Sequence, residues 1–126
     1  MYFCPMKNKK TLVLGASTKP ERYAFKAISM LVGKGHSVIA VGQNPGEVAG
    51  IKINTKNLPL NNIDTVTLYL NPVRQREYYN YIIETKPKRV LFNPGTENPE
   101  FYQLLKANGI KVEEACTLVL LTTNQY

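Results

Sequence analysis

Five short segments hold the residues best suited to chemistry, and each directly follows a run of apolar and β-branched residues. Their glycines permit close backbone approach, and their asparagines offer amide donors and acceptors. Lys19, Arg22 and Arg74 add positive charge. Such a set favours an anionic ligand, above all a phosphate compound. The segments are GASTKPER (15–22), GQNPGE (42–47), NPVR (71–74), NPGTENP (93–99) and EACT (114–117).

The common phosphate fingerprints are absent from these segments. A dinucleotide site is marked by GxGxxG and by an acidic residue about 20 positions further on, which binds the ribose hydroxyls. No further glycine follows Gly15 within that motif, and the second segment begins with Gly42 and Gln43 in place of an acid. GKGH (33–36) lacks the Ser or Thr that must follow GK in a nucleotide-hydrolase loop. The sequence therefore disfavours NAD recognition and nucleotide hydrolysis.

Catalytic groups are sparse. His36 is the only histidine and stands at the start of an expected strand, on the edge opposite the five segments, so we expect a structural role. Ser17 lies in the first segment, but the spacing assigns it no basic partner. Cys116 follows the last expected strand, where we expect a buried and inert thiol. No Cys/His cluster indicates a metal site. The sequence predicts a binding site without catalytic residues.

Apolar runs predict the strands that position these segments. Four runs are short and almost continuously apolar, as in strands buried on both faces. IKVEEA (110–115) predicts a last strand and GIKI (50–53) a short edge strand, and residues 54–64 are expected to form a loop or a short helical turn. The four apolar runs are TLVLG (11–15), SVIAV (37–41), TVTLYL (65–70) and RVLF (89–92).

Three helices are expected between the strands. Ala24, Ala27, Ile28, Leu31 and Val32 form one apolar stripe at helical spacing, in a helix that ends near 33–35. The pairs Asn71-Pro72 and Asn98-Pro99 each place a preferred N-cap before a proline at the first helical position. The second helix is expected to run to the residue before Pro87, and the third to Gly109.

This alternation predicts an α/β fold: a Rossmann-like, doubly wound, mainly parallel sheet of five to six strands with helices on both faces. We expect one domain over residues 1–126. Ligands of such sheets bind beyond the carboxyl ends of the strands, where the five segments fall. No stretch approaches the ~20 apolar residues of a membrane span, and no secretory signal is recognised. With Cys4 and Cys116 unpaired, we expect a cytoplasmic protein.

The net charge of +7 permits several partners. Lysines crowd the N-terminus at Lys7, Lys9 and Lys10 and are otherwise scattered, without an Arg-rich stripe or RNA-binding aromatic motif, so nucleic acid is not expected. The apolar stretch TLVLLTTNQY (117–126) is expected to offer a surface for a second copy of the chain, as in a homodimer.

Five stretches in order give the chain a resemblance to a known family. The chain resembles the small, single-domain CoA-binding proteins of the Rossmann type, and is similar to the CoA-binding domain at the start of the succinyl-CoA synthetase alpha subunit. The resemblance covers residues 10 to 116 and implies coenzyme A as the ligand. The stretches are VLGASTKPERYAFKA, HSVIAVGQNPGEVAGIKI, DTVTLYLNPV, VLFNPGTENPEF and NGIKVEEACTLV.

The resemblance implies that four turns form the CoA site. The first would cradle phosphate or sugar at the nucleotide end, with two cations nearby, and the second would line the adenosine–phosphate region. The third would form a wall near the adenine or pantetheine, and the backbone of the fourth would close the site. The residues so implied are Gly15, Ala16, Ser17, Lys19, Arg22, Gln43, Asn44, Pro45, Leu70, Asn71, Pro72, Asn93, Pro94 and Gly95.

The chain departs from the family at two points. Phe92 and Asn93 stand where a tryptophan and a glutamine are usual, and the second turn reads AVGQNP in place of the common proline-valine-asparagine-proline. The synthetase's catalytic phosphohistidine follows this domain, and His36 cannot replace it, so the resemblance does not imply ligase chemistry.

Three functions follow as hypotheses. The first is a CoA or acyl-CoA binding protein, a sensor or carrier without catalytic machinery. The second is a small enzyme that uses CoA or a nicotinamide cofactor, with Ser17 or Cys116 as the reactive group. The third is a Rossmann domain that has lost its ligand and acts as an interaction module.

Overall fold

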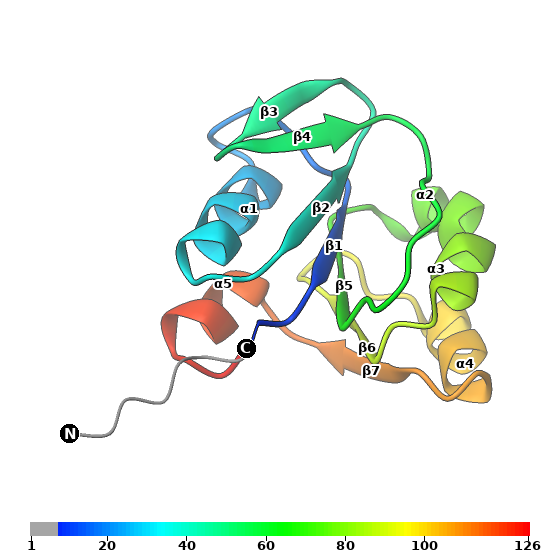
Figure 1. The fold of residues 1–126 in the computed structure, drawn as a ribbon. Coiled ribbons are helices and arrows are strands. Elements are labelled where there is room, and N and C mark those ends of the chain that lie inside the picture. Colours follow the sequence, from blue (N-terminus) through cyan, green and yellow to red (C-terminus); the bar gives the residue numbers. More distant parts are fainter. Residues whose placement is uncertain (1–7) are drawn as a thin grey trace.

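The computed structural model describes residues 8–126, so Cys4 and Lys7 lie outside the described residues. Seven strands form one sheet in the order β3-β4-β2-β1-β5-β6-β7 (Figure 1). All neighbours pair in parallel except β3, which is antiparallel to β4. The strands are β1 (Thr11–Leu14), β2 (Val38–Val41), β3 (Gly46–Val48), β4 (Ile51–Asn54), β5 (Thr65–Leu68), β6 (Arg89–Phe92) and β7 (Lys111–Glu114).

The predicted α/β, doubly wound, mainly parallel sheet is confirmed, with seven strands in place of five to six. The additional strand is β3, which begins within the second predicted ligand segment and ends one residue beyond it. Its hairpin with β4 makes β4 an interior strand, so the expectation of an edge strand at 50–53 was wrong. The hairpin was missed because GEV is too short to show an apolar pattern.

Apolar content places the central strands. All four residues of β1, β5 and β6 are buried, as strands covered on both faces require. β5 is shorter than expected, because Tyr69 and Leu70 leave the strand at its carboxyl end. These two residues turn toward the site described below.

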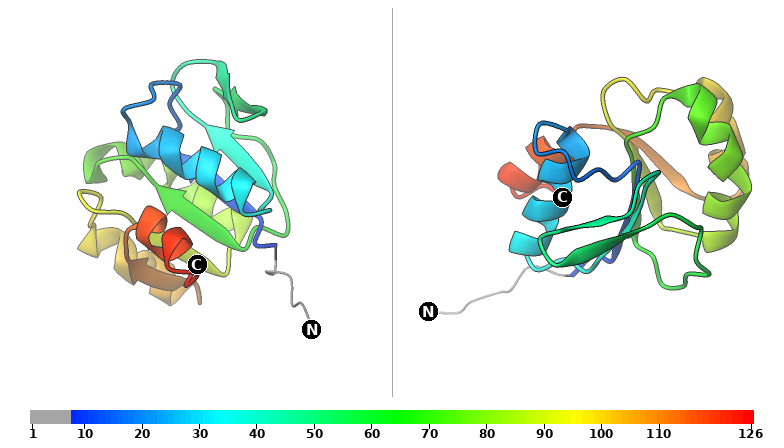
Figure 2. Two further views of the ribbon diagram at one scale, coloured as in Figure 1. Left: turned by 90° about the vertical axis from the view of Figure 1, so that its left-hand side faces the viewer. Right: turned by 90° about the horizontal axis from the view of Figure 1, so that it is seen from above.

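Helices cover both faces of the sheet (Figure 2). One face carries α1 and α5, and the other carries the remaining helices. The predicted second helix is interrupted by a single 3-10 turn, η1 (Arg76–Tyr78), and stops at Lys86, which adopts a left-handed conformation. The helices are α1 (Tyr23–Gly33), α2 (Pro72–Gln75), α3 (Tyr79–Thr85), α4 (Pro99–Ala107) and α5 (Thr117–Thr122).

The C-terminal stretch folds onto its own sheet. Residues 117–122 form α5, which packs beside α1, and Leu121 is fully buried in the core on that face. Tyr126 is also buried there, and its hydroxyl shares a 2.6 Å hydrogen bond with the Thr11 hydroxyl. The buried residues of this stretch therefore complete the domain's own core, and its contact with a second copy in a homodimer stays a prediction.

In the described part of the chain, no helix is long and apolar enough to cross a membrane.

Candidate functional site

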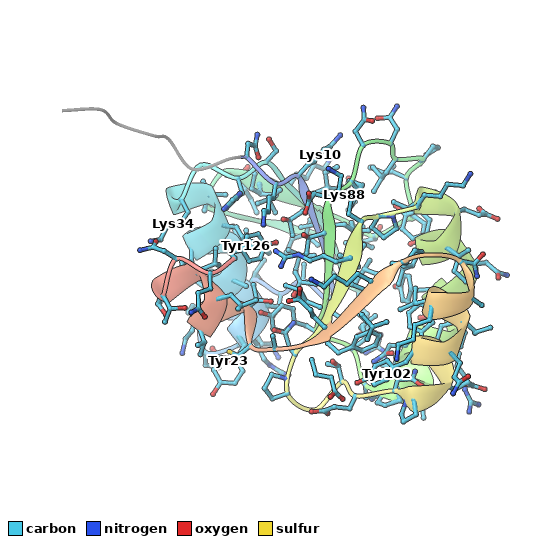
Figure 3. The ribbon with its side chains drawn as sticks, turned by 90° about the horizontal axis from the view of Figure 1, so that it is seen from below. Lys10, Tyr23, Lys34, Lys88, Tyr102 and Tyr126 are labelled. Atoms are coloured by element: carbon cyan, nitrogen blue, oxygen red, sulfur yellow. The ribbon has the colours of Figure 1, made fainter. Side chains whose placement is uncertain are left out.

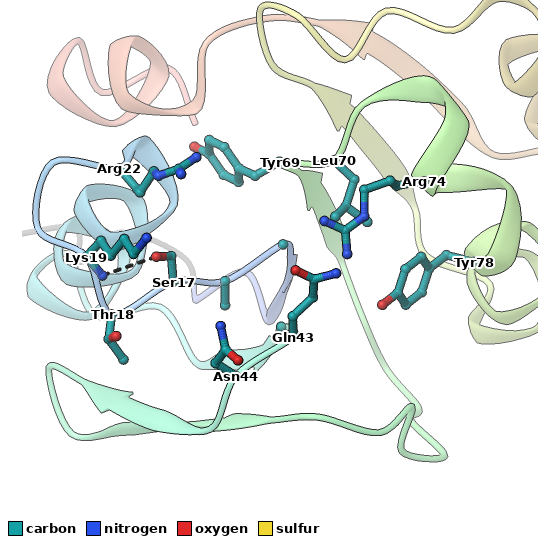
Figure 4. A pocket seen from close by; sticks show the side chains of 13 residues that line it. Ser17, Thr18, Lys19, Arg22, Gln43, Asn44, Tyr69, Leu70, Arg74 and Tyr78 are labelled. Carbon is teal, nitrogen blue, oxygen red and sulfur yellow. Dashed lines mark hydrogen bonds between the residues drawn. The ribbon is translucent and has the colours of Figure 1, made fainter.

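A pocket opens at the carboxyl edge of the sheet, where strand order reverses on either side of β1. The turns after β1, β2 and β5 form its walls, and the start of the α2–α3 segment completes them (Figure 4). This edge is the usual ligand position in a doubly wound sheet. The lining residues are Gly15, Ala16, Ser17, Thr18, Lys19, Arg22, Gly42, Gln43, Asn44, Tyr69, Leu70, Arg74 and Tyr78.

The floor of the pocket is a tight turn after β1. Gly15 has φ +89°, and the Gly15 and Ala16 amides donate to the Val41 carbonyl at 2.9 and 3.0 Å. A Cβ at Gly15 would lie 2.6 Å from the Tyr69 carbonyl oxygen. The backbone after β1 therefore lies too close to the backbone after β5 to leave room for a side chain at this position. At Gly42 a Cβ would overlap the Ala16 carbonyl oxygen. Glycine is therefore required at both positions.

The N-terminus of α1 faces the pocket without a side-chain cap. Arg22 occupies the N-cap position and makes no capping hydrogen bond, and no acidic residue lies in the first turn. By contrast, α2 and α4 are capped by the side chains of Asn71 and Asn98. Helix N-termini carry free N–H groups and partial positive charge, which suit an anion. Lys19 and Arg22 add two exposed cations beside this helix end.

The opposite wall comes from the β2 and β5 turns. With the Gln43 amide oriented toward the guanidinium, its Oε1 accepts from Arg74 Nη1 at 3.1 Å and from Nη2. Burial raises the pKa of the Tyr69 phenol to about 12, and burial together with Glu77 raises the pKa of Tyr78. Both phenols are therefore neutral near pH 7. None of the described residues that line the pocket is Asp or Glu, so the charge that they contribute is entirely positive.

Eight of the fourteen residues expected to bind CoA meet in this pocket. The other six do not line it. Asn71 caps α2, where its Oδ1 accepts from the Arg74 amide at 2.9 Å. Pro94 lines a separate small hollow, and the Gly95 amide donates to Glu97 Oε1 at 2.9 Å. The residues outside the pocket are Pro45, Asn71, Pro72, Asn93, Pro94 and Gly95.

Asn93 is a structural junction. Its Nδ2 donates to Thr67 Oγ1 at 2.7 Å and to the Leu68 carbonyl at 2.8 Å, and its Oδ1 accepts from the Thr117 amide at 2.9 Å. Asn93 is 3% exposed. Its amide thus ties β5, β6 and the start of α5 together, and all of its described partners belong to the protein.

Sequence reasoning left five pocket residues out of the predicted site: Thr18, Gly42, Tyr69, Arg74 and Tyr78. Gly42 and Arg74 were noted as residues of the right segments. The two tyrosines gave no signal, because Tyr69 reads as part of an apolar strand and Tyr78 as part of a helix stripe. Only the early end of β5 and the bend at η1 bring them to the pocket.

The three candidate catalytic residues lie apart. Ser17 lines the pocket, and its Oγ accepts from the Lys19 amide at 3.1 Å. Cys116 stands before α5, outside the pocket, in a small hollow with Glu97 and Glu114. Cys116 is half-buried, so the expectation of a buried thiol was wrong, whereas its expected inertness stays a prediction. His36 lies on the opposite edge of the sheet, as predicted.

The contacts of His36 indicate a structural role. His36 is 5% exposed, its Nδ1 accepts from the Lys9 amide at 3.0 Å, and its ring packs on the Tyr126 ring with the two centroids 5.0 Å apart. Figure 3 shows this edge, with Tyr126 between α1 and the strands. Burial, then the charges of Lys9 and Arg89, lower the pKa of His36 below its ordinary 6.5.

We expect His36 to make stability fall with acid. The pKa of His36 is lower in the native state than the 6.5 of the unfolded chain, so the unfolded chain takes up the proton first as the pH falls. The stability linked to neutral His36 is therefore present above pH 6.5 and is lost as the pH falls from there through the lowered native pKa. Urea unfolding of wild type and His36→Gln between pH 8 and pH 5 measures this. The variant should show the flatter profile, and parallel profiles would contradict the assignment.

Within residues 8–126, no group of three or more His, Cys, Asp and Glu side chains is arranged to hold a metal ion.

The fold and the pocket together define a doubly wound α/β domain with a positively charged crevice at its topological switch point. Residues 9–122 match the family model of the CoA-binding domain. The chain therefore belongs to the CoA-binding domain family.

Solved structures show the same fold. An uncharacterised protein is 47% identical, with a TM-score of 0.93, over 96% of this chain and 100% of that one. A hypothetical protein from Pyrococcus horikoshii OT3 is 29% identical, with a TM-score of 0.80, over 90% of this chain and 81% of that one. A conserved hypothetical protein from Pyrococcus furiosus is 26% identical, with a TM-score of 0.77, over 88% and 97% of the two chains. No curated protein matches the chain.

Proposed function

We propose that this protein binds coenzyme A or an acyl-CoA in the crevice and acts as a sensor or carrier of it. The observation that carries the proposal is a pocket with three cations and no acid, built at the uncapped end of α1 in a chain of the CoA-binding domain family. CoA brings phosphate groups that such a pocket neutralises.

The residues present fit the nucleotide end of CoA. The turn at 15–17 permits close backbone approach, and the α1 terminus with Lys19 and Arg22 would hold the diphosphate. Gln43, Asn44 and the wall from β5 would hold the adenosine part. CoA would supply a thiol or thioester, and the described residues give it no paired base.

Binding without turnover is supported by the positions of the reactive groups. Ser17 is engaged by a backbone amide and has no histidine near it, since His36 lies on the far edge of the sheet. Cys116 lies outside the pocket. Its thiol is free, which suits a reducing compartment, and we propose a cytoplasmic role on that ground.

Calorimetric titration with CoA, acetyl-CoA, NAD and NADP tests the proposal. We expect CoA species to bind with Kd values of about 1–100 μM, because a few charge-assisted hydrogen bonds together with helix-end amides supply a binding free energy of that size. We expect NAD to bind far more weakly, since no acid follows β2. Absence of heat with CoA and acetyl-CoA at 50 mM salt would refute the proposal.

The cations can be tested by substitution. Arg22→Ala should lower CoA affinity only about fivefold, near 1 kcal/mol, because water screens the charge of this exposed guanidinium. The pair Lys19→Ala and Arg22→Ala should weaken CoA about 30-fold. Lys26→Ala, one turn further along α1 and outside the pocket, is the control and should bind CoA as wild type does. Equal binding by all these variants would exclude the α1 end as the phosphate site.

A further inference from the structure

The further inference concerns Arg74, which stands apart from the other two cations of the pocket. It lies in α2, where the Asn71 cap fixes its backbone, and its guanidinium crosses to Gln43 on the β2 turn (Figure 4). Among residues 8–126, no carboxylate lies within ion-pairing distance of it. An amide is thus the partner of this half-buried cation, and its charge is not neutralised.

The contact between Gln43 and Arg74 lies where doubly wound domains bind the adenosine ribose. In doubly wound domains the pyrophosphate lies at the first turn and the adenosine ribose at the end of the second strand. An acidic residue there binds a free ribose hydroxyl, whereas an arginine nearby accommodates a ribose phosphate. Here Gln43 follows β2 by two residues, and Arg74 is its partner.

The division of charges agrees with this position. Lys19 and Arg22 lie beside the α1 terminus on the first turn, whereas Arg74 projects from the opposite wall beside Tyr78 (Figure 4). A guanidinium binds phosphate in a bidentate manner, and a neutral glutamine amide can donate to the same group. A ribose hydroxyl, by contrast, offers no charge to match Arg74.

We propose that Gln43 and Arg74 form a subsite for a phosphate on the ribose, so that the pocket selects CoA over dephospho-CoA. The inference rests on the proposed function and adds to it the group that is recognised. A ribose phosphate would take the place of the Gln43 carbonyl at the guanidinium, while the glutamine NH₂ would remain available as a donor.

Paired titrations with CoA and dephospho-CoA test the subsite. Wild type should bind CoA about 10- to 100-fold more tightly than dephospho-CoA. The two ligands differ only in the ribose phosphate, and the charge-assisted hydrogen bonds to that phosphate change affinity by about this factor. Arg74→Gln should lose about tenfold or more of its CoA affinity and less than about threefold for dephospho-CoA. Arg76→Gln is the matched control, since Arg76 is exposed, pairs with Glu100 and lies outside the pocket.

A second variant tests the subsite without removing the cation. Gln43→Glu places a carboxylate against Arg74, which neutralises it and repels a phosphate. We expect CoA affinity to fall at least about tenfold, with dephospho-CoA again much less affected. Thermal unfolding of each variant establishes that the protein is folded.

The outcomes separate the two proposals. Equal binding of CoA and dephospho-CoA by wild type, or equal weakening of both by Arg74→Gln, would overturn the subsite and leave CoA binding in place. Failure of wild type to bind either compound would overturn the proposed function, and the subsite with it.

Discussion

Gly15→Ala is expected to destabilise the protein by about 3 kcal/mol and to weaken CoA binding. The φ of +89° costs an L-residue about 1 kcal/mol, and overpacking against fixed backbone costs about 1–3 kcal/mol more. The added Cβ would lie 2.6 Å from the Tyr69 carbonyl oxygen, and this backbone is held in place because the Tyr69 amide donates to the Leu14 carbonyl at 2.9 Å. Chemical denaturation measures the stability, and calorimetry measures the binding.

Two other glycines separate the causes. Gly95 has φ +92°, but a Cβ there meets open space, so Gly95→Ala should cost only the conformational part, about 1 kcal/mol. Gly33 lies in α1 with no atom near its added Cβ, and Gly33→Ala should be neutral or stabilise by up to about 1 kcal/mol. A Gly15→Ala protein no less stable than Gly95→Ala would contradict the close approach.

Asn93→Ala is expected to lower stability by about 3 kcal/mol and Tm by about 10 °C, since it leaves buried groups unpaired. The Thr117 amide loses its only described partner, and the Leu68 carbonyl and Thr67 hydroxyl each lose a donor. Asn71→Ala is the matched control. That asparagine is an exposed N-cap, and its loss should cost about 1 kcal/mol.

The same variant separates two views of Asn93. The resemblance implies a place for its backbone in the CoA site, whereas the structure places its side chain outside the pocket and among protein partners. We expect Asn93→Ala to lose stability far more than CoA affinity, when binding is measured at a temperature where it is folded. A selective loss of binding at unchanged Tm would assign the side chain to the ligand.

The fold was largely predictable because its central strands are covered on both sides. Burial on both faces requires continuous apolar runs, and TLVL and RVLF show them directly. The Asn-Pro helix starts were predictable because capping and proline preference are local effects. The β3–β4 hairpin was not, since three residues with a glycine and a glutamate carry no strand pattern.

The pocket residues in the turns directly after the strands were predictable from the sequence, whereas the two tyrosines of the pocket were not. Gly15 directly follows β1 and Gln43 follows the neighbouring β2 by two residues, so the sheet alone brings them together. Tyr69 and Tyr78 reach the pocket only through the early end of β5 and the bend at η1, which depend on tertiary packing. Asn93 has the right position for a ligand contact, but its partners come from β5 and from α5, which lie far from it in sequence.

The packing of residues 117–126 against the α1 side of the sheet also affects folding during synthesis. Leu121 and Tyr126 belong to the same core as Val13, Ile28 and Leu91, and the Lys9 ammonium donates to the Tyr126 carbonyl across 117 residues of sequence. During synthesis on the ribosome, the α1 side of the sheet stays incompletely covered until these residues emerge. The domain therefore completes its core late, and until then exposes apolar surface of the kind that chaperones bind.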